Sequence, residues 1–292
     1  LRPNVVQRWL RWIGGLAWIL IQLTCIAAAD PLPQRIVSTA PAITEILFAL
    51  SLGERIVGVT TFCQFPEAAR RIPKVGGFLS PNVEVLLSLR PDLVIFLSEK
   101  TQLQDRLRQL GLAHLPLNLK TTAGLLQAIQ QIGETTGKQT SARQLTASIR
   151  EQLDAIRTRI EHGRRKRVLF VVGRTPGTLS DLRVAGAATY LDEIISVAGG
   201  ENVFQNSQTS YPPASKEELL RLDPEVVFDF THGAQATAQK IAEVKGLWAK
   251  LPALTAVRKG QIYILHEDYF LVPGPRVVQA AERLSEILQA AE

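Results

Sequence analysis

The stretch from residue 138 to 162 carries one apolar stripe at helical spacing, and it limits what the rest of the chain can form. Its apolar residues recur every three or four positions, which places them along one face of a helix. They are Ala142, Leu145, Ile149, Leu153, Ile156 and Ile160. Ser141 with Gln144 predicts a capping box near its start. At 1.5 Å per residue such a helix is roughly 35 Å long, enough to cross a small domain.

Short strand-like and helix-like segments alternate on both sides of this stretch. Residues 35–39, 55–60 and 93–97 before it, and 167–172 and 225–230 after it, are apolar runs typical of strands. Such alternation indicates parallel sheets flanked by helices. We therefore predict an α/β fold of two Rossmann-like lobes joined by one long rigid helix. The predicted parts are an N-terminal lobe over 30–136, a connecting helix over 137–163 and a C-terminal lobe over 164–292.

One local pattern occurs in both predicted lobes. Residues 82–94 (NVEVLLSLRPDLV) match residues 215–227 (SKEELLRLDPEVV) at one fixed offset, with a helix cap, an acid, a Leu pair, a proline and a second acid coinciding. Capped Leu-rich helices before strands can also arise by chance in α/β folds. The number of matching positions favours an internal duplication.

The first 29 residues are typical of a secretory signal peptide. Arg2, Arg8 and Arg11 precede an apolar run over 13–21, and three alanines over 27–29 supply a cleavage site. The apolar run is short for a membrane span, although an uncleaved anchor is the alternative. The residues before Cys25 fit a lipoprotein box poorly, so we expect a periplasmic protein without a lipid anchor.

Export changes what charge and cysteine content imply. The chain has 33 lysines and arginines against 27 acidic residues, and three of the arginines lie in the expected signal peptide. The remaining excess is too small to indicate binding to nucleic acid or to an anionic membrane. Cys63 is the only cysteine outside that peptide, so no disulfide can form within the mature chain.

Six short motifs resemble one known family. They are residues 35–45 (RIVSTAPAITE), 58–66 (GVTTFCQFP), 82–84 (NVE), 198–202 (AGGEN), 215–217 (SKE) and 268–276 (DYFLVPGPR). In this order they resemble the periplasmic cobalamin-binding proteins of ABC importers. These belong to the helical-backbone group, class III of the periplasmic binding proteins, whose members also carry haem, siderophores and metal ions. The resemblance implies that a ligand is held between the lobes.

Aromatic residues on loops support that expectation. Phe62 and Phe78 follow strands of the first lobe, and Tyr211 and Tyr269 lie on loops of the second. Rings on loops suit a large, flat, partly apolar ligand because they offer contact area at little entropic cost. The alternative is that they fill the lobe cores, which is our interpretation of Phe65. The resemblance implies that the four aromatic positions contact the ligand.

The resemblance also assigns Asp268 to the ligand site. Other contact positions of the family fall on Leu97, Thr178 and Val272, where a ring or an arginine would be expected. His232 and Arg174 follow strands and are weaker candidates, since each could equally be a polar or solvated loop residue.

Metal or covalent chemistry is not indicated. The four histidines are scattered, and we interpret Cys63 as a small buried thiol. No phosphate-binding loop, dinucleotide fingerprint or serine-nucleophile elbow is present, so we predict a protein that is not an enzyme and has no cofactor of its own.

Glu84 and Glu217 occupy matching positions in the repeated pattern. Each is expected in the first turn of a helix, where a carboxylate is stabilised by the helix dipole. In the family, the glutamates at these positions resemble a pair that forms salt bridges with arginines of the permease dimer. We therefore predict a monomer that binds cobalamin or another corrinoid and docks on an inner-membrane ABC permease. Haem or a ferric siderophore is the alternative ligand, and a metal-ion carrier or an enzyme is less favoured.

Overall fold

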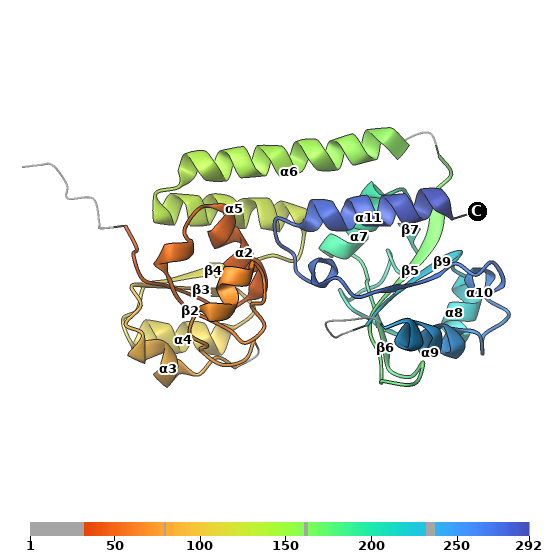
Figure 1. The fold of residues 1–292 in the computed structure, drawn as a ribbon, viewed down its shortest axis with the longest axis horizontal. Coiled ribbons are helices and arrows are strands. Elements are labelled where there is room, and N and C mark those ends of the chain that lie inside the picture. Colours follow the sequence, from red (N-terminus) through yellow and green to blue (C-terminus); the bar gives the residue numbers. More distant parts are fainter. Residues whose placement is uncertain (1–31, 79, 161–162, 232–236, 292) are drawn as a thin grey trace, which may run out of the picture. The chain divides into compact units, whose positions relative to one another are not determined.

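Two β-sheets organise the chain, one formed before helix α6 (Gln139–Ile160) and one after it (Figure 1). The computed structural model describes residues 32–78, 80–160, 163–231 and 237–291. The predicted signal peptide and His232 lie outside these residues. Residues 33–292 form one compact unit. Within the described part of the chain, every helix is too short or too polar to cross a membrane.

The first sheet is entirely parallel, with the strand order β2-β1-β3-β4. Its strands are β1 (Ile36–Ser38), β2 (Ile56–Val59), β3 (Leu93–Leu97) and β4 (His114–Leu117), connected through helices α2 (Pro41–Ala49), α3 (Val83–Ser88) and α4 (Thr101–Gln109) and followed by α5 (Thr122–Thr136). The strands predicted over 35–39, 55–60 and 93–97 are present as β1, β2 and β3, with ends that differ by at most one residue.

The second sheet is mixed, although most of its strands are parallel, as predicted. Its parallel strands are β5 (Lys166–Gly173), β7 (Gly200–Asn202), β9 (Val226–Phe230) and β10 (Ile262–Leu265). Two short strands, β6 (Leu182–Val184) and β8 (Pro213–Ala214), add an antiparallel edge. These strands of two or three residues are too short to leave an alternating pattern in the sequence. The helices of this half are α7 (Tyr190–Val197), α8 (Lys216–Leu222), α9 (Ala238–Trp248), α10 (Thr255–Arg258) and α11 (Val277–Ala290).

The parallel strands of the two sheets have the same topology. β5 pairs with β7 and β9 as β1 pairs with β2 and β3, and β10 follows β9 as β4 follows β3. Each copy of the repeated sequence pattern forms a capped helix and then a central strand, α3–β3 in one sheet and α8–β9 in the other. The duplication seen in sequence therefore extends to the order of strands.

The two copies also share hydrogen bonds that a helix–strand unit does not require. The residue before each proline, Arg90 and Asp223, has a positive φ (48° and 39°). The acid after each proline accepts a hydrogen bond from a backbone N–H at the start of the first strand of its sheet: Arg35 to Asp92 at 2.8 Å, and Arg167 to Glu225 at 3.1 Å. Bonds of such specific placement favour duplication over chance convergence.

Helix α6 buries the predicted stripe. Ala142, Ile149, Leu153 and Ile156 are buried where α6 packs on α5 and α11 (Figure 1). The predicted capping box is wrong, because the helix begins at Gln139 and residue 141 already lies within its first turn. Gly137 instead ends the preceding helix α5 in the left-handed conformation, as C-terminal glycines commonly do.

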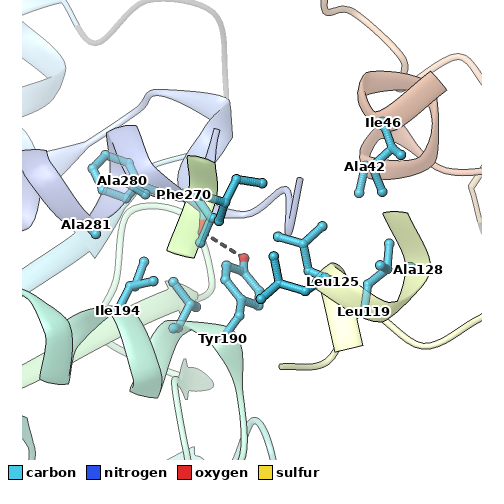
Figure 2. Packing of buried hydrophobic residues seen from close by; sticks show 14 of the residues in the cluster. Ala42, Ile46, Leu119, Leu125, Ala128, Tyr190, Ile194, Phe270, Ala280 and Ala281 are labelled. Carbon is cyan, nitrogen blue, oxygen red and sulfur yellow. Dashed lines mark hydrogen bonds between the residues drawn. The ribbon is translucent and has the colours of Figure 1, made fainter. Parts of the chain in front are cut away.

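A single hydrophobic core includes residues of both sheets. Residues alternate along each strand: Leu93 and Ile95 of β3 face this shared core, while Val94 and Phe96 belong to a smaller cluster on the other face. Residues of the second sheet also alternate between the shared core and a separate cluster on the other face of that sheet. Figure 2 shows Leu125 of α5 and Leu119 near Tyr190 of α7, whose hydroxyl donates a 2.7 Å hydrogen bond to the Phe270 carbonyl. The lobes are therefore held by packing as well as by α6.

The contact between α5 and α6 depends on a glycine. A Cβ added at Gly133 would lie 2.4 Å from the Ala142 Cβ, so Gly133→Ala should destabilise the fold by about 1–3 kcal/mol through overpacking. Gly246→Ala in α9 is the matched control, because its added Cβ meets nothing within 4 Å. The control should gain up to about 1 kcal/mol from helix propensity. Urea unfolding of both variants checks this, and an equal gain in the two would contradict the tight crossing.

Candidate functional site

Two adjoining hollows lie between the lobes, and together we call them the interlobe cleft. The larger has a volume of about 970 Å³ and the smaller about 540 Å³. They share the lining residues Phe78, Ser80, Leu97, Leu119, Leu271 and Pro273. The first four come from the N-terminal lobe and the last two from the C-terminal lobe, so the hollows are two parts of one cleft.

The cleft lies at the carboxyl ends of the first sheet's strands. Ala40 and Phe62 follow β1 and β2, Leu97 ends β3 and Leu119 follows β4. Ligands of open α/β sheets usually bind at this edge, because a crevice forms there between the loops where the strand order reverses. The second lobe adds residues at the start of α7, the loop before β8 and the segment after the turn Asp268–Phe270.

Backbone hydrogen bonds join the lobes beside the cleft. The N–H of Tyr190 donates to the carbonyl of Lys120 at 2.6 Å, and the N–H of Thr122 donates to Glu193 Oε2 at 2.6 Å. Both hydrogen bonds lie where α5 and α7 begin. These bonds and the shared core set the distance between the two walls of the cleft.

Three of the predicted aromatic residues line the cleft. The Phe62 side chain is 61% exposed and that of Tyr211 is 42% exposed, while Phe78 is partly buried between the two hollows. Burial raises the pKa of the Tyr211 hydroxyl and the charge of Glu99 raises it further, so this hydroxyl stays protonated at neutral pH. Exposed rings on the wall of a cleft offer apolar surface to a ligand.

Tyr269 lies elsewhere. Its ring packs on Phe270, with centroids 4.8 Å apart, and lines a separate hollow of about 520 Å³ between α6 and α11. The structure does not bring this ring to the cleft with the other three.

Asp268 forms an ion pair instead of lining either hollow. Its Oδ1 lies 2.7 Å from Arg276 Nη1, and the same guanidinium binds both carboxylate oxygens of Glu45 in α2, at 2.5 and 3.0 Å. Glu45 is 3% exposed and Arg276 12% exposed. Arg276 therefore links the two lobes through a buried ion pair.

The pKa values of Glu45 and Arg276 each depend on the other charge. Burial raises the pKa of Glu45, and the hydrogen bonds from Arg276 oppose that rise. For Arg276, burial favours the neutral form, but its two carboxylate partners outweigh it and raise the pKa above the ordinary value. The sequence motifs contain both residues, yet nothing marked them as partners. The one available signal was a carboxylate on the apolar face of α2.

Phe65 covers this ion pair. Its ring is 44% exposed, and the Arg276 Cζ lies 3.9 Å from the ring centroid. The interpretation of Phe65 as a core residue is therefore wrong: the ring stacks on the guanidinium from the N-terminal lobe. Stacking of this kind lowers the exposure of the guanidinium to water and adds a cation–π attraction.

Arg174 is engaged inside the second lobe. Its side chain is 8% exposed, and its Nε donates at 3.0 Å to Asp229 Oδ2, which also accepts from Trp248 Nε1 at 2.8 Å. It borders a different hollow of about 500 Å³ near Thr231. The alternative of a solvated loop charge is wrong, because the guanidinium is buried; a contact between Arg174 and the ligand stays a prediction.

Of the remaining predicted positions, some line the cleft and others do not. Leu97 and Val272 line the cleft, whereas Thr178 lies in a turn away from it. Cys63 is fully buried, as interpreted from the sequence. Among the described residues, no group of three or more histidine, cysteine or acidic side chains could hold a metal ion.

Glu84 and Glu217 are exposed in the first turns of α3 and α8. The helix N-termini are capped by neighbours: Asn82 Oδ1 and Ser215 Oγ each accept a backbone N–H at 3.1 Å. Within the parts of the chain that the structure covers, neither glutamate carboxylate forms a hydrogen bond or ion pair. Both are therefore available to a partner.

Comparison with known proteins identifies the family. A family model described as periplasmic binding protein matches residues 36–269. The chain belongs to the periplasmic binding protein family. A vitamin B12-binding protein of Pectobacterium carotovorum is 28% identical over 98% of this chain and 97% of its own length.

Solved structures agree on the fold and differ in ligand. The periplasmic vitamin B12 binding protein BtuF of Vibrio cholerae has a TM-score of 0.75 at 27% identity, covering 89% of this chain and 98% of that one. The periplasmic haem-binding protein RhuT of Roseiflexus has the same TM-score and identity, covering 88% and 98%. The chain is thus a class III periplasmic binding protein, in the family of substrate-binding components of ABC importers.

Breaking the Glu45–Arg276 pair should strongly destabilise the contact between the lobes. Arg276→Gln leaves a buried carboxylate without its partner and should cost about 3–5 kcal/mol of unfolding free energy. Asp268→Asn is the control: it removes only the half-exposed partner and should cost at most about 1 kcal/mol. Urea unfolding measures both. The double variant Glu45→Gln/Arg276→Gln should be more stable than Arg276→Gln alone; equal losses would contradict the coupling.

Proposed function

We propose that the chain is an exported solute-binding protein that captures cobalamin or a related corrinoid in the interlobe cleft and delivers it to an ABC permease. The observation that carries this proposal is the set of three rings, Phe62, Phe78 and Tyr211, on the walls of a cleft between the lobes. Ligand pockets commonly have volumes of about 300–1,000 Å³, and these two hollows together reach beyond that range. A ligand as large as a corrin suits such a cleft.

The proposed ligand contacts are the residues that line the cleft. Phe78 lies where the two hollows meet, Phe62 borders the smaller one and Tyr211 the larger. Asp268, Tyr269 and Arg174 are left out, because Asp268 and Arg174 are engaged in ion pairs and Tyr269 lines another hollow. The names of the relatives support a corrinoid, since the Pectobacterium and Vibrio proteins are both vitamin B12-binding proteins.

Haem is the second candidate ligand. The Roseiflexus haem-binding protein matches this chain as well as the Vibrio protein does, and the cleft has an apolar end that would accept a flat porphyrin. A titration of the purified protein with cobalamin, cobinamide, haem and a ferric siderophore decides between the classes. Heat from the siderophore alone would overturn the corrinoid proposal.

Tyr211 and Tyr269 provide a matched pair for placing the site. Tyr211→Ala should weaken ligand binding about tenfold, because it removes a ring of the cleft wall. Tyr269→Ala should change the affinity less than about twofold, since that ring lies outside the cleft. Calorimetric titration with the ligand that the parent binds gives both affinities. A larger loss in Tyr269→Ala would place the ligand elsewhere.

We also propose that Glu84 and Glu217 dock the protein on the permease. They are exposed, unpaired within the described residues and placed at equivalent points of the two repeated units. Equivalent carboxylates on two similar lobes suit a partner with two similar subunits, because each lobe can then meet the same surface. The helix starts bear the glutamates, while the cleft is lined by other residues, so binding and delivery should be separable.

Charge reversal tests this separation. Glu84→Arg/Glu217→Arg should leave ligand affinity within about twofold of the parent and abolish uptake in vesicles that contain the cognate permease, since repulsion replaces attraction. Glu134→Arg/Glu151→Arg makes the same change of charge at exposed positions of α5 and α6 and should leave uptake intact. Normal uptake by the first variant would show that the glutamates are only helix-end charges.

A further inference from the structure

The charged residues that line the interlobe cleft are mostly cationic. Among the described residues of the larger hollow these are Glu99, Lys100, Arg106 and Lys120. Glu99 Oε1 lies 3.6 Å from Lys120 Nζ, and this one acid faces three cations. Asp268, the acid that the family resemblance assigns to the site, shares Arg276 with Glu45 and lines neither hollow. The lining of the larger hollow therefore carries a net positive charge, to which Lys100 and Arg106 contribute.

Lys100 is held in place at the boundary of the apolar part. Its Nζ donates a hydrogen bond to the Phe78 carbonyl and lies 4.5 Å from the centroid of the Phe78 ring. Burial lowers the pKa of its ammonium group, and the charge of Glu99 opposes this. An ammonium group in such surroundings gains from a nearby anion, because it has lost part of its hydration.

Arg106 lies on the same wall, on helix α4. Thr101, Gln102, Leu103 and Arg106 of α4 all line the larger hollow, so this helix forms one side of it. The Arg106 side chain is exposed and has no hydrogen bond or ion pair within the described residues. Its planar guanidinium can bind a carboxylate or phosphate with two parallel hydrogen bonds.

The smaller hollow has the opposite character. The described residues that line it are uncharged, and all except Ser80 are apolar. Phe78 is common to both hollows, so the apolar end passes directly into the cationic end. One ligand that fills both must be apolar at one side and anionic at the other.

We propose that the ligand carries an anionic carboxylate or phosphate group, which Lys100 and Arg106 bind while Phe62 and Phe78 hold its apolar ring. The inference rests on the proposed function and narrows its ligand class. The charge of a corrinoid's phosphodiester and the charge of haem's propionates would both satisfy it, so forms of each ring with and without this anionic group separate the sources.

The experiment titrates the parent protein and the variant Lys100→Gln/Arg106→Gln with four ligands. Cobalamin is paired with cobinamide, which lacks the phosphodiester, and haem with its dimethyl ester. The variant should bind the member with the anionic group about tenfold more weakly than the parent does, and should not weaken binding of the member without it by more than about twofold. In the parent, added salt should weaken binding only of the member with the anionic group. Whichever pair shows this pattern identifies the source of the anion.

Two further variants keep the result specific. Arg106→Gln alone leaves the Lys100 contact with Phe78 intact. It should still weaken binding of the ligand with the anionic group about threefold. Arg108→Gln is the matched control, because Arg108 lies on the same helix, pairs with Asp105 and is not part of the cleft lining; it should change nothing. Equal losses for ligands with and without the anionic group, or no loss for either, would overturn the anion proposal while the proposed function stands. If the parent binds none of the four ligands, the proposed function fails first.

Discussion

Burial of one face of each sheet in a common core is the constraint on which the rest of the structure depends. Alternate residues of β1, β3, β5 and β9 face this core, together with α2, α5, α6, α7 and α11. Because the apolar faces of both sheets are used in one core, neither lobe can move far without exposing apolar surface. The walls of the cleft are therefore set by packing, and the loops that form them can carry exposed rings such as Phe62 and Tyr211 at little cost in stability.

The ion pair between Glu45 and Arg276 makes this packing more specific. A buried ion pair contributes little net stability compared with apolar packing, but it strongly penalises any arrangement that separates its members. Arg276 meets Glu45 of α2, Asp268 of its own lobe and the ring of Phe65, so three segments must be correctly placed at once. Arg276 shares its one positive charge between Glu45 and Asp268, and neither acid lines the cleft. The ion pair therefore fixes the lobes, while Lys100 and Arg106 supply the cationic lining of the larger hollow.

How far the sequence could predict the fold is seen in particular elements. The stripe from Ala142 to Ile156 marked α6, and capping residues such as Asn82 and Ser215 marked the helices of the repeat, because these signals act within a few residues. The shortest strands, β6 and β8, left no such signal. Among the site residues, Phe62 follows β2, Phe78 lies on the loop between β2 and α3, and Tyr211 lies on the loop before β8. The position of Tyr269, in contrast, depended on how its turn packs against α6 and α11.

By itself the sequence determined the α/β alternation, the long helix between two similar halves and the repeated helix–strand unit, since periodicity, caps and turns are local properties of a chain. Only the tertiary structure decided which charges meet. Glu45 and Arg276 are separated by 231 positions, and Arg174 and Asp229 by 55. No local pattern records such a pairing, because its free energy arises from burial and distance, which exist only once both sheets have packed into one core.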